Sequence, residues 1–266
     1  MWRPIERLFR YFAAAYVDLR ILAAGKADPD LPPLRLRFVG DGDFRSVGEQ
    51  LAALVLEHGG LRATSRLLDI GCGVGRVALP LARHLPAGVA YEGFDVVRGA
   101  VRWCRRRITR NRPNFRFRHV SVRSTEYSTF GVPAADFRFP FSDENFDCAF
   151  AFSVFTHLTL PEMRRYLRES RRVLAPGGRL IATFFLLNEE STALLPSQPS
   201  LYRFPIDAGS IRLATSANPG LAVAVDEDAL RSEIDAAGFG RHSVLRGQWS
   251  GHPNATTFQD LVVCEN

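Results

Sequence analysis

The sequence predicts an α/β protein: a doubly wound, mostly parallel sheet of seven strands with helices on both faces. Two observations predict this fold. Short apolar runs alternate with amphipathic stretches from residue 66 to residue 187, which is the rhythm of a parallel sheet. The first run leads directly into closely spaced glycines and a helix, the opening unit of a doubly wound fold. Two final strands are expected at 242–245 and 260–264.

The first unit runs from Arg66 to Arg76 and carries an unusual glycine pattern. A dinucleotide-binding turn needs Gly-x-Gly-x-x-Gly, and here its third glycine is replaced by Arg76. The glycines instead alternate at 71, 73 and 75, and Asp69 stands two residues before Gly71. A pyrophosphate has no use for a carboxylate at the mouth of the turn, whereas a ligand with an ammonium group does.

This acidic-x-Gly-x-Gly-x-Gly pattern resembles the first motif of the class I S-adenosylmethionine (SAM) dependent methyltransferases. The resemblance covers about residues 44–186 and the C-terminal strands. It implies a methyltransferase domain over 44–266, SAM as the cofactor and S-adenosyl-L-homocysteine as the product. It also implies that the turn holds the cofactor through a set of neighbouring residues: Asp69, Gly71, Cys72, Gly73 and Arg76. An NAD oxidoreductase is excluded by Arg76.

The second strand, expected at 89–95, ends in Asp95. Parallel topology places this end beside the glycine turn, where a carboxylate can accept hydrogen bonds from two ribose hydroxyls. The same aspartate could instead cap the helix expected at 98–110. Its position resembles the family's second motif, which favours the ribose role and makes Val96 an apolar wall for the adenine.

The third strand, within 114–122, lacks the acid that the family often has after it. Ser121 and Val122 stand at that place, and a serine hydroxyl or the backbone can still accept the adenine amino group. The fourth strand, 147–152, leads into Ser153, which we expect beside the cofactor.

His157 follows on the same segment, and we expect it near the transferred methyl group. An imidazole titrates near neutrality and could take the proton of a hydroxyl acceptor. The alternative is a histidine that only holds its loop through a side-chain hydrogen bond. His252, between the last two strands, is the reserve base.

Residues 188–225 interrupt the alternation after a fifth strand, 180–187, that follows a tight turn at Pro176-Gly177-Gly178. An insertion this long exceeds an ordinary connection, and we expect a cap over the acceptor pocket. A surface excursion without a role is the alternative.

Residues 1–43 form an N-terminal extension, with an amphipathic helix expected at 2–24 and a linker. We expect that helix to pack on its own domain or on a twin subunit in a homodimer; attachment to a membrane surface or another partner is disfavoured but open. The glycine-acid loop at 38–44 either folds over the cofactor or is a simple turn.

Composition indicates an ordinary globular chain, 46% hydrophobic and 23% charged. Its four cysteines show no CxxC spacing, which argues for a cytoplasmic protein without a disulfide framework or metal site. Between residues 96 and 125 stand ten arginines and no acid. This arginine block (residues 98–123) could bind phosphates or nucleic acid; a solvated helix face and strand edge is the favoured interpretation.

These observations lead to one hypothesis: a SAM-dependent methyltransferase acting on a small molecule, with a hydroxyl of a natural product, sugar or lipid-like compound as acceptor. A nucleic-acid or protein methyltransferase that uses the arginine block is the first alternative. Ser153-Val154-Phe155 stands where enzymes that methylate base amines have an Asn/Asp-Pro-Pro-Tyr motif, which disfavours nucleic acid. A non-catalytic SAM-binding or partner-binding module is the second alternative.

Overall fold

The computed structural model describes residues 3–26, 28, 30–37, 42–124, 127–199, 202–252, 255 and 257–266. For residues 3–10 the description covers the backbone alone. Residues 38–41 of the glycine-acid loop, on which one prediction was made, lie outside the described residues.

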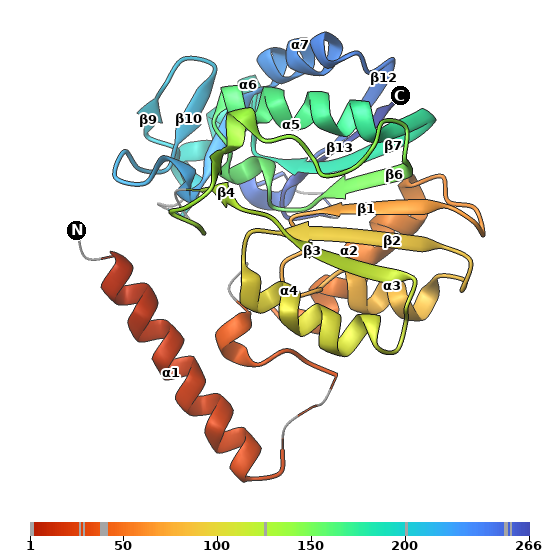
Figure 1. The fold of residues 1–266 in the computed structure, drawn as a ribbon. Helices are drawn as coiled ribbons and strands as arrows, with labels where there is room; N and C mark the ends of the chain where they lie inside the picture. Colours follow the sequence, from red (N-terminus) through yellow and green to blue (C-terminus); the bar gives the residue numbers. More distant parts are fainter. Residues whose placement is uncertain are drawn as a thin grey trace.

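In the described chain, seven strands form the central sheet (Figure 1). In order across the sheet they are β12 (Arg241–Leu245), β13 (Asp260–Glu265), β7 (Leu174–Phe184), β6 (Phe146–Ala151), β1 (Arg66–Ile70), β2 (Ala90–Asp95) and β3 (Phe115–His119). Strand β13 runs antiparallel to both of its neighbours, and every other pairing is parallel. The predicted seven-stranded, mostly parallel sheet is confirmed.

Helices cover both faces of this sheet (Figure 1). One face carries α2 (Phe44–His58), α3 (Ala78–His84) and α4 (Arg98–Cys104), which the π-helix η2 (Arg105–Thr109) continues; the other carries α5 (Leu160–Val173) and α7 (Glu227–Ala237). Successive strand residues point to opposite faces, so Leu67 packs with the first layer and Leu68 with the second. Burial on both faces explains why this strand is uniformly apolar.

Both ends of α7 carry residues that are typical of helix boundaries. The Asp226 carboxylate accepts a hydrogen bond from the Ala229 N–H at 2.9 Å, as an N-cap does. At the other end Gly238 has a φ of 90°, the left-handed conformation that favours glycine after a helix.

The predicted turn before strand five lies inside a longer strand, as a bulge in which Gly177 has a φ of 74°. Strand β7 already begins at Leu174 and continues through Pro176-Gly177-Gly178, with a shift in its register against β6. The reason lies at the C-terminus of the chain: the Gly177 N–H donates to the Asn266 carbonyl at 2.9 Å, and the Asn266 N–H donates to the Gly178 carbonyl at 2.8 Å. These bonds hold the segment as a strand.

Residues 188–225, here called the insert, fold into a small unit beside the main sheet. They contribute to a second sheet in the order β8 (Leu186–Leu187), β11 (Val223–Asp226), β10 (Ile211–Leu213) and β9 (Ile206–Asp207). The insert also holds α6 (Glu189–Leu194) and two 3-10 turns, η5 (Leu195–Ser197) and η7 (Pro219–Leu221). Its apolar core is built around Phe185, Phe204 and Trp249.

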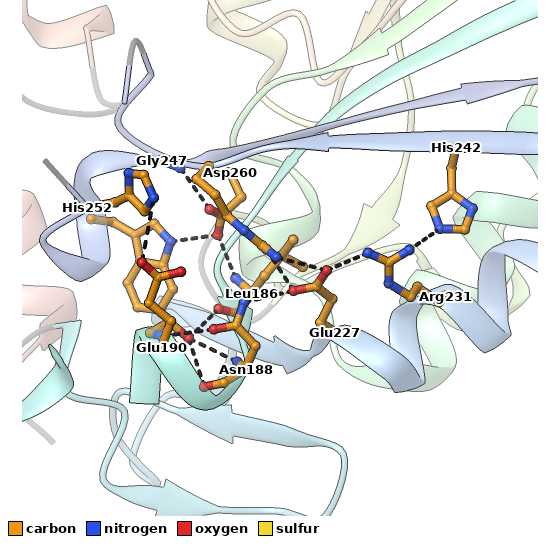
Figure 2. Close-up of polar contacts among 12 residues, drawn as sticks. Leu186, Asn188, Glu190, Glu227, Arg231, His242, Gly247, His252 and Asp260 are labelled. Carbon is orange, nitrogen blue, oxygen red and sulfur yellow. Dashed lines mark hydrogen bonds and ion pairs between the residues drawn. The ribbon is translucent and has the colours of Figure 1, made fainter. Parts of the chain in front are cut away.

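Two buried carboxylates anchor the insert, and we call them with their donors the insert root (Figure 2). Asp260 accepts hydrogen bonds from the backbone N–H groups of Leu186 and Gly247, each at 2.8 Å, and from the Trp249 indole at 2.6 Å. Glu227 accepts hydrogen bonds from three side chains: Asn188 at 2.8 Å, Arg231 at 2.6 Å and Arg246 at 3.1 Å.

The remaining elements connect the layers. They are α1 (Arg3–Ala23), the 3-10 turns η1 (Leu34–Leu36), η3 (Ala134–Asp136), η4 (Phe155–His157) and η8 (Gln248–Ser250), and the strand pair β4 (Val122–Arg123) and β5 (Val132–Pro133). Among the described helices, none combines the length and apolar character needed to cross a bilayer.

Candidate functional site

The glycine turn between β1 and α3 has left-handed φ angles, 75° at Gly71 and 52° at Gly73. A Cβ at Gly71 would lie 2.5 Å from the Val154 Cγ2 atom, so no larger residue fits there. A Cβ at Gly73 would meet no atom within 4 Å. Gly73 therefore presents bare backbone to open space, which lets a ligand approach the turn closely.

Asp95 ends β2 beside this turn and is 8% exposed. Its Oδ2 accepts a hydrogen bond from the Gly73 N–H at 2.8 Å, and its Oδ1 accepts one from the Val97 N–H at 2.7 Å. Helix α4 begins after Val97, whose N–H lies outside the helix, so Asp95 is not the N-cap. A carboxylate has about four acceptor positions, so Asp95 retains capacity for ribose hydroxyls. Burial raises its pKa above the ordinary value.

Asp69, on β1, is 4% exposed and takes its hydrogen bond from the Tyr91 hydroxyl through Oδ2. Within the described chain, no hydrogen bond to its Oδ1 is present. Burial, and secondarily the negative charge of Asp95, raises the pKa of Asp69 to about 7, although the bond from Tyr91 opposes the rise. This carboxylate therefore changes charge near neutral pH.

A single cavity joins the ends of β1 and β2 to the segment after β6. Six of the residues proposed from the sequence line it: Gly71, Asp95, Val96, Val122, Ser153 and His157. The insert contributes Pro219 and Gly220 to the same wall. The structure thus brings the expected ribose carboxylate and the expected base to one space.

The other proposed site residues lie outside the cavity wall. Asp69 lies near the end of β1, and Gly73 lies in the glycine turn that follows it. The Cys72 side chain is buried against Gly93. The Arg76 guanidinium lies over the Phe44 ring, 5.6 Å from its centroid. The Ser121 side chain is exposed, and its carbonyl accepts the Val132 N–H at 3.1 Å. Their roles toward a cofactor stay predictions.

Ser153 occupies a strained position at the cavity wall, with a φ of 55°. Such a conformation persists in a non-glycine residue only when its surroundings fix it. The Ser153 N–H donates to the Thr183 hydroxyl at 2.8 Å, and the Ser153 hydroxyl donates to the Gln259 side chain at 3.1 Å. Strand β7 and the residue before β13 therefore hold Ser153, and with it the start of η4.

His157, in η4, is oriented by the insert. Its Nδ1 lies 2.8 Å from the Gly220 carbonyl oxygen, which can only accept, so Nδ1 carries the proton. In the neutral ring Nε2 is then the basic nitrogen. The Tyr127 hydroxyl lies 3.5 Å from Nε2, at the long limit for a hydrogen bond. His252, the reserve base, is not on the cavity wall; it lies 3.6 Å from Glu190 at the insert root (Figure 2).

Sequence reasoning did not assign five polar residues of the cavity wall to the site: Ser124, Tyr127, Thr159, Glu162 and Tyr166. Glu162 also accepts a hydrogen bond from the Thr159 N–H at 2.7 Å in a capping box, so its sequence signal is that of a helix start. Burial, followed by the charges of Glu162 and Asp95, raises the pKa of Tyr166. This hydroxyl therefore stays a hydrogen-bond donor inside the cavity.

The residues present fit a nucleoside that carries an amino acid. Open space lies before Gly73, Asp95 offers acceptors at the ribose position, and Val96 and Val122 are apolar neighbours. A family model described as "Methyltransferase domain" matches residues 67–178.

Residues 67–178 are a methyltransferase domain of the class I SAM-dependent family. SAM is accordingly its cofactor, as predicted, and the role of Asp95 and the glycine turn in holding it stays a prediction.

Two curated proteins and one solved structure illustrate the similarity. Over 133 residues the chain is 31% identical to the methyltransferase GfsG of Streptomyces halstedii, covering 50% of this chain and 42% of that protein. It is 29% identical to the 27-O-demethylrifamycin SV methyltransferase of Amycolatopsis mediterranei, covering 67% and 55%. A SAM-dependent methyltransferase structure from Mesorhizobium loti has a TM-score of 0.55 at 14% identity, covering 82% and 98%. The chain thus spans about half the length of these curated relatives.

Proposed function

We propose that the chain transfers the methyl group of SAM to a hydroxyl of a small, largely apolar molecule. One observation carries this proposal: the cavity that contains Asp95 also contains His157, whose Nδ1–H is fixed on the Gly220 carbonyl. That bond directs the basic Nε2 to act on an acceptor. The name of the rifamycin methyltransferase relative supports a hydroxyl acceptor on a natural product.

Bound SAM supplies an activated methyl group on a sulfonium. The chain must orient the acceptor, exclude water and receive a proton. Aromatic and aliphatic side chains around the cavity, among them Phe94, Leu158 and Tyr166, exclude water. With SAM bound, His157 Nε2 would take the proton of the acceptor hydroxyl, so that the hydroxyl oxygen could accept the methyl group.

The test is turnover of a panel of hydroxylated compounds that includes 27-O-demethylrifamycin SV, with S-adenosyl-L-homocysteine as the measured product. For a turned-over acceptor, His157→Gln lowers kcat by about 10²- to 10⁴-fold and leaves the Kd for SAM unchanged. His84→Gln is the matched control, since its imidazole lies on α3 and pairs with Glu49. Full activity of His157→Gln would remove His157 as the base.

The same assay decides between this function and its alternatives. Tight SAM binding without product for any hydroxylated compound would favour a SAM-binding module. Methylation of RNA or protein would favour the arginine block, of which only Arg123 lines the cavity.

A further inference from the structure

Helix α1 presents an apolar face that the described chain does not cover. Phe12, Tyr16, Leu19 and Leu22 follow at helical intervals of four, three and three, which places them on one face. Their exposed fractions lie between 60% and 65%. A helix on a globular surface normally turns its apolar face inward, so this orientation is the reverse of the usual one.

The opposite face of α1 is the one that contacts η1, within the N-terminal extension. Ala14, Asp18 and Ile21 are half-buried. The Asp18 carboxylate accepts the Leu34 N–H of η1 at 2.7 Å and pairs with the Arg35 guanidinium at 2.9 Å. The expectation that the apolar face packs on its own domain is therefore not met for the described side chains, and the helix stands apart from the sheet (Figure 1).

The surface beside α1 is strongly basic. Leu36 of η1 lies near Gly99 at the start of α4, so α1 is tethered on the side of the sheet that carries the arginine block. Nine arginines of that block have exposed side chains, at positions 98, 102, 105, 106, 107, 110, 116, 118 and 123. Within the described residues only Arg118 of these forms an ion pair with a carboxylate, Glu92 at 3.2 Å.

We propose that α1 lies on the surface of an anionic lipid bilayer, with its apolar face in the headgroup region and the arginine block facing the lipid phosphates. A 21-residue helix with exposed aromatic and leucine side chains and a basic surround has the features of an interfacial anchor. A second copy of this chain would bring the same net charge of +6 to the contact, so charge favours an anionic partner over a twin. The proposal goes beyond the proposed function and is independent of the acceptor.

Vesicle flotation of the full chain tests this directly. We expect binding to 70:30 phosphatidylcholine:phosphatidylglycerol vesicles that is at least tenfold stronger than to pure phosphatidylcholine and that weakens with salt. The variant L19D/L22D should lose at least tenfold of this binding, while L56D, an equally polar change at an exposed leucine of α2, should not. The variant R102E/R106E should lose the preference for anionic vesicles.

Three results would overturn the proposal. They are absence of binding to anionic vesicles at low salt, equal binding by L19D/L22D, and a stable dimer in sedimentation that L19D/L22D dissociates, which would assign the face to a second copy. RNA binding unaffected by L19D/L22D, without vesicle binding, would assign the arginines to nucleic acid instead.

Discussion

Two pairs of buried carboxylates differ in how fully the protein satisfies their acceptor positions. At the insert root, Asp260 accepts three hydrogen bonds and Glu227 is surrounded by three side-chain donors (Figure 2). At the glycine turn, Asp95 accepts two backbone hydrogen bonds and Asp69 accepts one, from Tyr91. The first pair is saturated by the chain itself, whereas the second retains acceptor capacity.

The pKa values of Glu227 and Asp69 differ in the same sense, although burial raises the pKa of Asp260 as well. The hydrogen bonds to Arg246, Asn188 and Arg231 outweigh the opposing effect of burial and lower the pKa of Glu227 to about 2. Burial dominates at Asp69 and raises its pKa to about 7. A carboxylate that the fold needs is thus held ionised at neutral pH, while one beside a candidate ligand site is left close to its titration point. We infer that a buried carboxylate whose acceptor positions are filled by the protein has a structural role. One that keeps unfilled acceptor positions is available to bind a ligand.

The largest expected effect is on stability at the insert root. Asp260→Ala leaves three buried donors without an acceptor, and we expect the free energy of unfolding to fall by about 3–5 kcal/mol. Urea titration measures it. Asp143→Ala is the control, because that side chain is exposed and its ion pair with Arg172 is worth less than about 1 kcal/mol. If Asp260→Ala lowered the free energy of unfolding no more than Asp143→Ala does, the structural role assigned to Asp260 would be contradicted.

The next effect is on cofactor affinity. Asp95→Ala should weaken SAM binding by about 1–3 kcal/mol, roughly 5- to 150-fold in Kd, because charged hydrogen bonds to the ligand are lost. Calorimetry on the folded variant measures it, and Glu92→Ala, three residues before Asp95 on β2, is the matched control. An unchanged Kd would remove Asp95 from the binding site.

The smallest effect is a pH dependence. If Asp69 holds the ligand ammonium, its ionised form is required, and protonation below pH 7 weakens binding. With a pKa of about 7, the affinity for SAM should rise about tenfold from pH 6 to pH 8. Asp69→Asn should flatten that profile. A wild-type profile that is already flat would assign Asp69 to its bond with Tyr91 alone.

The sequence predicted the sheet because its strands are locally distinctive: Leu67, Leu68 and Ile70 are apolar in sequence and fully buried in the fold. It also placed Asp95 correctly, since parallel topology converts a strand end into a position beside the glycine turn. It did not predict that the turn at Pro176-Gly177-Gly178 is a bulge within β7, where its backbone pairs with a distant residue, Asn266.

Much of the cavity was beyond prediction for the same reason. Glu162 has the sequence signal of a helix cap, and no neighbouring residue in the sequence indicates that it also lines a cavity. The contact between His157 and Gly220 joins residues 63 positions apart, and it depends on how the insert folds. Sequence patterns report an element's own periodicity, whereas cavity walls are assembled by packing between elements.

The chain leaves the main sheet after β7 and returns through β11, which pairs in parallel with β8, Val225 opposite Leu186. The strands that lead into and out of the insert, β8 and β11, are therefore adjacent, and Asp260 fixes them through its hydrogen bond from Leu186. Because its two attachment points are adjacent, the insert can be replaced by another segment without moving the main sheet. Such a replacement would alter the choice of acceptor and leave the glycine turn and Asp95 unchanged.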